Sequence, residues 1–237
     1  MKQFVSILMV ALLLCCTGSP VQAGEATLQQ VISTLEQGYA GLQDLQAGFN
    51  QTTVLAGFPK PQKGHGELAL RRPQQGTAQF RFDYTLPKQS IISNGKQVWF
   101  YQPETRQVMV SSLEGMMKGG NSIGMAYLTG LGNVSKDFNA VFSKPGRDKQ
   151  GNYLIDLTPR KPTPVLSRLR LAIREEAVNA FLADGQVKEL FPVASSTVFD
   201  VSGTETRISY SRIRTNSGLS AAKFTFTVPK GVEIIKP

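Results

Sequence analysis

Three short runs in the first half of the chain carry more large apolar side chains than a sheet with one face in water can hold. These runs are 68–73, 80–84 and 91–103. Successive side chains of a strand point to opposite faces, so apolar residues at consecutive positions load both faces of a sheet. A sheet built from these runs therefore needs a covering layer or an apolar ligand.

Turn-forming residues separate the runs. The dipeptide Asn94-Gly95 lies between two apolar segments and favours the type I′ turn, in which both central residues have positive φ. Segments 88–93 and 97–102 are therefore predicted to pair as an antiparallel hairpin. The whole of 66–111 is predicted to form a meander of adjacent strands.

Arg72 stands at the end of the first run, directly before Pro73, whose missing amide proton cannot join a sheet. Strand alternation places Leu68, Leu70 and Arg72 on one side. One interpretation leaves the guanidinium in water with its stem along the strand, and the residue pattern alone favours it. The other buries the guanidinium, which then donates to carbonyl groups across a cavity.

The N-terminal residues have the organisation of an export leader. A short basic start precedes an apolar run at 4–16, and small residues lie ahead of a plausible cut after Ala23. The run is too short to cross a bilayer of about 30 Å as a helix. We predict a signal peptide at 1–23 and a single exported domain at 24–237. A lipid anchor at Cys16 is not favoured, because Cys15 is a poor residue for the preceding position.

Composition limits the expected partners. Both cysteines fall within 1–23, so the exported chain is expected to lack disulfides and thiolate metal sites. The formal net charge is +9, but the cations are dispersed rather than gathered on one helix or ribbon. Nucleic acid is therefore not an expected partner. An anionic membrane surface or an acidic partner suits the charge better, and a merely solubilising charge is an equal alternative.

Helix and strand signals flank the meander. Apolar spacing of three or four predicts a helix from about 25 to 47, with the first strand starting at Phe49. The glycine- and methionine-rich stretch 112–138 contains a predicted short helix near 122–128, which either accepts varied apolar ligands or fills a gap. Further strands of one curved antiparallel sheet are predicted at 153–159, 169–173, 192–199, 207–211 and 224–227.

The sequence gives little support for a catalytic site. His65 is the single histidine, and it lies between glycines without a recognisable nucleophile turn. Glu175-Glu176 is predicted to be a polar turn, because adjacent residues of a strand point to opposite faces and cannot act as a pair. Clusters with metal-ligand spacing and glycine-rich phosphate loops are absent from the sequence. We expect neither an enzyme nor a cofactor, since a lipid or glycan hydrolase would need such a constellation.

Several segments together resemble one family. They are 42–51, Arg72-Pro73, 80–84, 94–103 and 222–232, which occur in the family's order from the first helix to the last strand. The chain resembles the LolA family, the periplasmic carriers of outer-membrane lipoproteins. This resemblance implies an α+β, mainly β fold: an open, incomplete antiparallel β-barrel whose helices form a lid over an apolar cavity.

The same resemblance implies the site. Arg72 matches the family's functional arginine, the latch that ties the lid closed, and this match favours the buried interpretation. Segment 121–130 falls at the family's lid helix. Either Trp99 and Tyr101 or their neighbours Val98 and Phe100 face inward. The expected acyl-chain cavity is lined by Leu68, Leu70, Phe80, Phe82, Ile91, Trp99, Tyr101, Met125 and Leu128.

The implied function is carriage of lipoproteins through the periplasm by their acyl chains, by a monomer that uses no nucleotide. An inner-membrane lipoprotein-releasing ABC transporter would load the carrier, and an outer-membrane lipoprotein receptor would accept the cargo. The alternative is a periplasmic sensor of lipid or mislocalised lipoprotein on the same scaffold, although such a regulator would normally carry a second domain.

Overall fold

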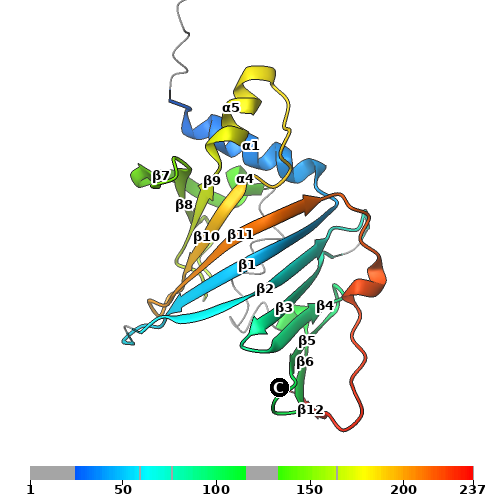
Figure 1. Cartoon of the computed structure of the whole chain (residues 1–237). Helices are drawn as coiled ribbons and strands as arrows, with labels where there is room; N and C mark the ends of the chain where they lie inside the picture. Colours follow the sequence, from blue (N-terminus) through cyan, green and yellow to red (C-terminus); the bar gives the residue numbers. More distant parts are fainter. Residues whose placement is uncertain (1–24, 59, 76, 116–132, 164, 237) are drawn as a thin grey trace, which may run out of the picture.

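The computed structural model describes residues 25–58, 60–75, 77–115, 133–163 and 165–236 (Figure 1). The predicted signal peptide at 1–23 lies outside the described residues. Within the described ranges, no helix is both long enough and apolar enough to cross a membrane.

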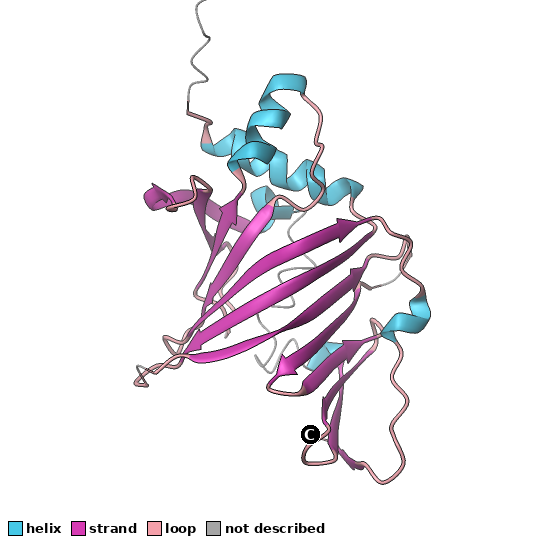
Figure 2. Cartoon of the chain, in the orientation of Figure 1, coloured by secondary structure: helices cyan, strands magenta, loops and turns pink. Residues whose placement is uncertain are grey.

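A single sheet of twelve strands dominates the structure (Figures 1 and 2). The strand order is β12-β6-β5-β4-β3-β2-β1-β11-β10-β9-β8-β7, and the pairing of β12 with β6 is parallel whereas the other pairings are antiparallel. The two ends of this order do not pair in the described structure, so the expected mainly β, open architecture is confirmed. The strands are β1 (Asp44–Val54), β2 (Gln62–Arg71), β3 (Gln79–Leu86), β4 (Gln89–Ser93), β5 (Gln97–Gln102), β6 (Gln107–Ser112), β7 (Phe138–Arg147), β8 (Tyr153–Pro159), β9 (Arg168–Ile173), β10 (Val193–Phe199), β11 (Glu205–Thr215) and β12 (Glu233–Ile235).

Helices cover one end of this curved sheet. Figures 1 and 2 show α1 (Leu28–Gly41) and α5 (Glu175–Asp184) side by side there. A capping box starts α1: the Thr27 hydroxyl accepts from the Gln30 amide, and the Gln30 side chain accepts from the Thr27 amide at 2.8 Å. The shorter helix α4 (Val134–Asp137) contacts α1, and η2 (Ala221–Phe224) lies against β3. The buried face of α1 carries Val31, Ile32, Thr34, Leu35, Gly38 and Tyr39.

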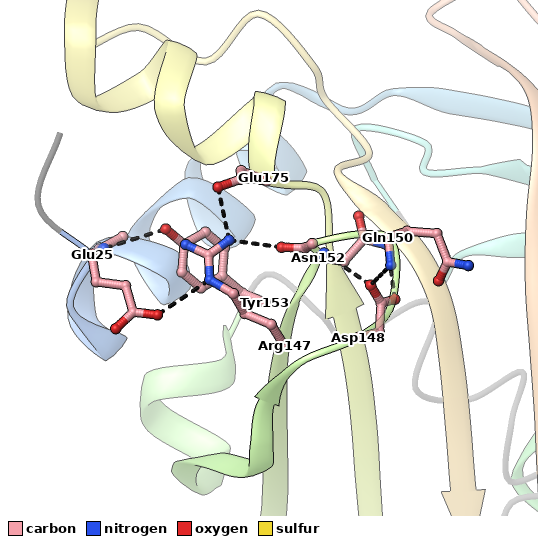
Figure 3. Close-up of polar contacts among 9 residues, drawn as sticks. Glu25, Arg147, Asp148, Gln150, Asn152, Tyr153 and Glu175 are labelled. Atoms are coloured by element: carbon pink, nitrogen blue, oxygen red, sulfur yellow. Dashed lines mark hydrogen bonds and ion pairs between the residues drawn. The ribbon is translucent and has the colours of Figure 1, made fainter. Parts of the chain in front are cut away.

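An arginine fixes the segment that enters α1 (Figure 3). Arg147, at the end of β7, pairs with Glu25 at 3.2 Å and with Glu175, the first residue of α5, at 2.8 Å. Its guanidinium carbon lies 3.9 Å from the centre of the Tyr153 ring, and the Tyr153 hydroxyl accepts a hydrogen bond from the amide of Ala26. The N-terminal end of α1 is thereby tied to the β7–β8 hairpin and to α5.

The predicted meander is confirmed, because β2 to β6 lie next to one another in chain order. The hairpin at Asn94-Gly95 is also confirmed, but its predicted turn type was wrong. Gly95 has a φ of 89°, whereas Asn94 is not among the residues with positive φ. The Asn94 side chain instead accepts hydrogen bonds from the amides of Lys96 and Gln97, both at 2.9 Å. This local bonding makes a three-residue connection.

The predicted boundary between the first helix and the first strand was wrong. The helix ends at Gly41, Leu42 is already extended, and β1 begins at Asp44 rather than at Phe49. Leu42 and Leu45 satisfy both a helical and an alternating pattern, so spacing alone did not separate the two elements.

Two further predictions are corrected. Glu175 and Glu176 form the first turn of α5 rather than a polar turn between strands, and acidic residues favour that position because of the helix dipole. The strand predicted at 224–227 does not form: Phe224 ends η2, and β12 occurs later.

Two apolar clusters lie on opposite faces of the sheet. The larger cluster lies on the face that α1 covers, which we call the inner face, and includes Tyr39, Phe49 and Phe82. The smaller cluster lies on the other side of β4 to β6, the outer face, where Trp99 and Tyr101 pack against Phe226 from the C-terminal segment. The apolar runs of the meander therefore load both faces, as their composition requires.

The packing of α1 on the inner face predicts the effect of a truncation there. Leu35 has no exposed surface, so Leu35→Ala is expected to lower the free energy of unfolding by about 2–5 kcal/mol. Gln29, exposed on the same helix, is the matched control, and Gln29→Ala is expected to change it by less than about 0.5 kcal/mol. Urea denaturation measures both values, and equal effects would contradict this packing.

Candidate functional site

The inner face of the central strands is a continuous apolar surface. Leu68, Leu70, Phe80 and Phe82 each expose 3% or less of their surface. They belong to the same buried cluster as the apolar side chains of α1. Edge-on ring contacts join β1 to β3: the centroids of Phe49 and Phe82 lie 5.5 Å apart.

Strand register decides which neighbours share this face. Phe82 pairs with Ile91, and Ile91 pairs with Phe100 across β3, β4 and β5. Paired residues point to the same face, so Ile91 and Phe100 lie on the inner side with Phe82. Val98, two positions before Phe100, belongs to the same inner cluster.

The placement of Trp99 and Tyr101 on the cavity face was wrong. Trp99 pairs with Ile92 and, like Tyr101, packs with Phe226 on the outer face. Apolar residues occupy consecutive positions of β5 because both faces are covered, the outer one by the C-terminal segment. The inward pair is therefore Val98 and Phe100. Met125, Leu128 and the expected lid helix at 121–130 lie outside the described residues.

Arg72 binds the C-terminal end of α1. The side chain is half-buried, and its Nη1 donates to the carbonyl of Tyr39 and, at 3.4 Å, to the carbonyl of Leu42. Its backbone amide donates to the carbonyl of Gln43 at 2.7 Å. The last carbonyls of a helix have no partner within it and carry a partial negative charge, which a cation stabilises. The last turn of α1 contains no basic residue, so Arg72, the residue after β2, supplies this charge.

Asn216 is a second residue at this helix end, and sequence reasoning missed it. Its Nδ2 donates to the carbonyl of Gly41 at 2.9 Å, while its Oδ1 accepts from the amide of Gln43 at 2.7 Å. Arg72 and Asn216 together therefore bind the carbonyls of residues 39, 41 and 42. The only sequence signal was the turn-forming Asn-Ser-Gly composition of 216–218, which says nothing of a partner so distant in the chain.

Asp44 holds the loop that carries Asn216. Its carboxylate accepts from the amides of Ser217 and Gly218 at 2.8 Å, from the amide of Leu219 at 3.1 Å and from the Ser217 hydroxyl. Burial raises the pKa of Asp44, but these four hydrogen bonds to the charged form outweigh it and hold the pKa below its ordinary value of 3.8.

A cavity of about 580 Å³ lies at the opposite end of the inner face from α1. The hydroxyl of Tyr84 donates to the Gln51 side chain there at 2.8 Å, and burial raises the pKa of this tyrosine to about 12. The Tyr84 ring contacts Phe49 of the apolar cluster, with centroids 4.8 Å apart. The cavity is lined by Gln51, Thr53, Gln62, Lys63, Gly64, Tyr84, Leu86, Pro87 and Gln89.

The single histidine and the possible metal ligands are the candidates that the sequence offers for catalysis or metal binding. His65 is exposed on β2, opposite Asn50 of β1. The described residues contain no group of three or more His, Cys, Asp or Glu side chains that could hold a metal ion. The inner face and the bound end of α1 are thus the features that a function has to explain.

A sequence profile described as "Outer membrane lipoprotein carrier protein LolA" matches residues 40–227. The chain belongs to the LolA family. An outer-membrane lipoprotein carrier protein of Azotobacter vinelandii is 29% identical over 220 residues, which is 92% of each chain. That of Chromobacterium violaceum is 28% identical over 222 residues, 92% of this chain and 95% of the relative. Arg72, Asp44 and Asn216 all lie within the part of the chain that matches LolA.

The pKa of Asp44 predicts a pH dependence for this LolA-family protein. A carboxyl whose folded pKa lies below its unfolded value contributes stability above the unfolded value, and this contribution is lost as the pH falls through the folded pKa. Asp44→Asn is expected to lower the free energy of unfolding by about 1–3 kcal/mol at pH 7. The difference between wild type and variant should shrink below about pH 4. Urea denaturation across pH 3–7 checks this, and a constant difference would contradict it.

Proposed function

We propose that this LolA-family protein is exported to the periplasm, loses residues 1–23, and carries lipoproteins with their acyl chains held against the inner face. The observation that carries this proposal is the binding of Arg72 to the end of α1, above apolar side chains that are almost fully covered. In this proposal an acyl chain reaches Leu68, Leu70, Phe80 and Phe82 when α1, which shares their buried cluster, moves away. Arg72 is then the latch of this layer.

The hydrogen bonds of the latch contribute less energy than the burial of the acyl chains. Burying one methylene group contributes about 0.8 kcal/mol, so a lipoprotein with several acyl chains gains much from an apolar surface. A hydrogen bond to a charged group contributes about 1.5–3 kcal/mol. The bonds of Arg72 to the α1 carbonyls stabilise the closed, empty state and oppose cargo binding by that amount. This opposition favours transfer to an acceptor that binds the acyl chains more tightly.

The proposed partners follow from this cycle. An inner-membrane lipoprotein-releasing ABC transporter supplies cargo that cannot cross water unaided, and an outer-membrane lipoprotein receptor accepts it. The carrier acts as a monomer without a nucleotide or cofactor, because the exchange depends on the difference in acyl-chain affinity. The description of the matched family as outer membrane lipoprotein carriers and the names of the relatives support the carrier role within this cycle.

Replacing the latch is expected to change release rather than loading. Arg72→Leu removes the hydrogen bonds of the closed state, so the variant should bind a triacylated lipoprotein but retain it about tenfold to a hundredfold more strongly against acceptor membranes. The measurement is the fraction of lipoprotein that moves to outer-membrane vesicles, with native mass spectrometry to count the cargo bound beforehand. Failure of wild-type protein to bind lipoprotein would refute the carrier role itself.

Two further variants distinguish loss of the latch from a general loss of structure. Arg71→Leu is the matched control, because Arg71 bonds to Gln79 of β3 rather than to α1, and it should transfer cargo like wild type. Asn216→Gly keeps the positive φ of 53° accessible while removing the amide that binds Gly41. It should retain cargo more than wild type and less than Arg72→Leu. Normal transfer by Arg72→Leu would refute the latch while leaving the carrier role intact.

A further inference from the structure

Two exposed apolar side chains lie on neighbouring loops at one end of the sheet. Phe58, in the β1–β2 loop, is 67% exposed, and Val201, in the β10–β11 loop, is 62% exposed. The amide of Ala56 donates to the Thr204 hydroxyl at 3.5 Å, which joins the two loops. Figure 1 shows both loops together at the end of the long strands away from α1. We call Phe58 and Val201 the apolar tip.

Two cations lie beside Phe58 in the sequence. Lys60 and Lys63 are exposed on the chain that leaves the β1–β2 loop, and residues 54–63 contain no acidic side chain. In the other loop, Asp200 accepts from the amides of Ser202 and Thr204, both at 2.8 Å, so its charge is directed into its own turn. The β1–β2 loop thus combines Phe58 with two cations and no acidic residue, whereas the β10–β11 loop carries Val201 beside Asp200, and Glu205 follows at the start of β11.

Most other exposed apolar residues do not gather in this way. Single exposed apolar side chains are ordinary on protein surfaces, whereas neighbouring ones mark a contact site. In the described structure, Val141 on β7 is 58% exposed and Ile234 on β12 is 52% exposed, and these strands form the two edges of the sheet. They serve as controls because their exposure matches that of Val201.

We propose that the apolar tip docks reversibly onto the surface of an anionic phospholipid bilayer. Phe58 and Val201 enter the boundary between headgroups and acyl chains, while Lys60 and Lys63 lie among the anionic headgroups. The net charge of +9 draws the whole molecule towards such a surface. Two apolar side chains give shallow, weak binding, so the protein leaves the bilayer again.

The orientation of the tip relates this contact to the inner face. Leu86, 57% exposed at the β3–β4 turn, and Lys88 next to it lie at the same end of the central strands. Leu86 also lines the cavity of about 580 Å³ that adjoins the inner apolar cluster. Docking through the tip therefore turns this end of the inner face towards the membrane. The bilayer contact itself does not require that the protein carries lipoproteins.

Vesicle flotation of the exported protein tests the proposal. Wild-type protein should float with vesicles of phosphatidylethanolamine and phosphatidylglycerol at low salt, and not with pure phosphatidylcholine. The double variant Phe58→Ser with Val201→Ser should float about fivefold less. Lys60→Gln with Lys63→Gln should weaken binding and reduce its salt dependence. The control pair Val141→Ser with Ile234→Ser should float like wild type.

A fluorescence measurement shows directly whether the tip enters the bilayer. Trp99 is the single tryptophan and is 9% exposed, so it gives a nearly constant background. Emission of the indole introduced by Phe58→Trp should shift to the blue on anionic vesicles and be quenched by lipids brominated near the headgroup. Absence of wild-type binding to anionic vesicles, or equal flotation of the tip and control pairs, would overturn the proposal. An indole that stays in water while the protein floats would assign the contact to another surface.

Discussion

The hydrogen bonds between Arg72 and the last carbonyls of α1 join the two layers of this structure. They connect the end of β2 to the helix that covers the inner face, and they satisfy carbonyls that the helix leaves without partners. Asn216 binds a third carbonyl at the same place, and Asp44 fixes the loop that presents it. At the other end of α1, Arg147 ties the entering chain to α5 and the β7–β8 hairpin. The helix is therefore held at both ends by polar contacts rather than by burial alone.

This arrangement separates what stabilises the sheet from what covers it. The sheet is held by backbone pairing along twelve strands and by side chains on both faces. The cover is held by hydrogen bonds at the two ends of α1 and by the apolar side chains that α1 buries on the inner face, a contact that an acyl chain can replace. An apolar ligand can therefore compete with the cover without competing with the sheet. This separation is the physical basis for the proposed carrier cycle, in which the cover opens and closes while the sheet persists.

The sequence was most informative where pattern and turn chemistry agreed. The meander from β2 to β6 follows from its alternating runs, Pro73 and Asn94-Gly95, and the strands at β8 to β11 follow from similar signals. Where adjacent positions of a strand are both apolar, as at Val98 and Trp99, the pattern does not show which side chain faces inward. The structure does, because Phe226 of the C-terminal segment packs against Trp99 on the outer face. Arg72 was found through a family resemblance, whereas the sequence around Asn216 indicates only a turn, because its partner is a helix end far away in the chain.

The most direct test of the latch is the distance between α1 and the sheet in empty and loaded protein. Both native cysteines lie within 1–23, so spin labels at Gln37→Cys on α1 and Asn50→Cys on β1 occupy unique, exposed sites. Pulsed electron resonance should show one short distance in empty wild-type protein and a longer one after loading with a triacylated lipoprotein. Arg72→Leu should already populate the longer distance when empty. An unchanged distance in protein shown to be loaded would contradict the account.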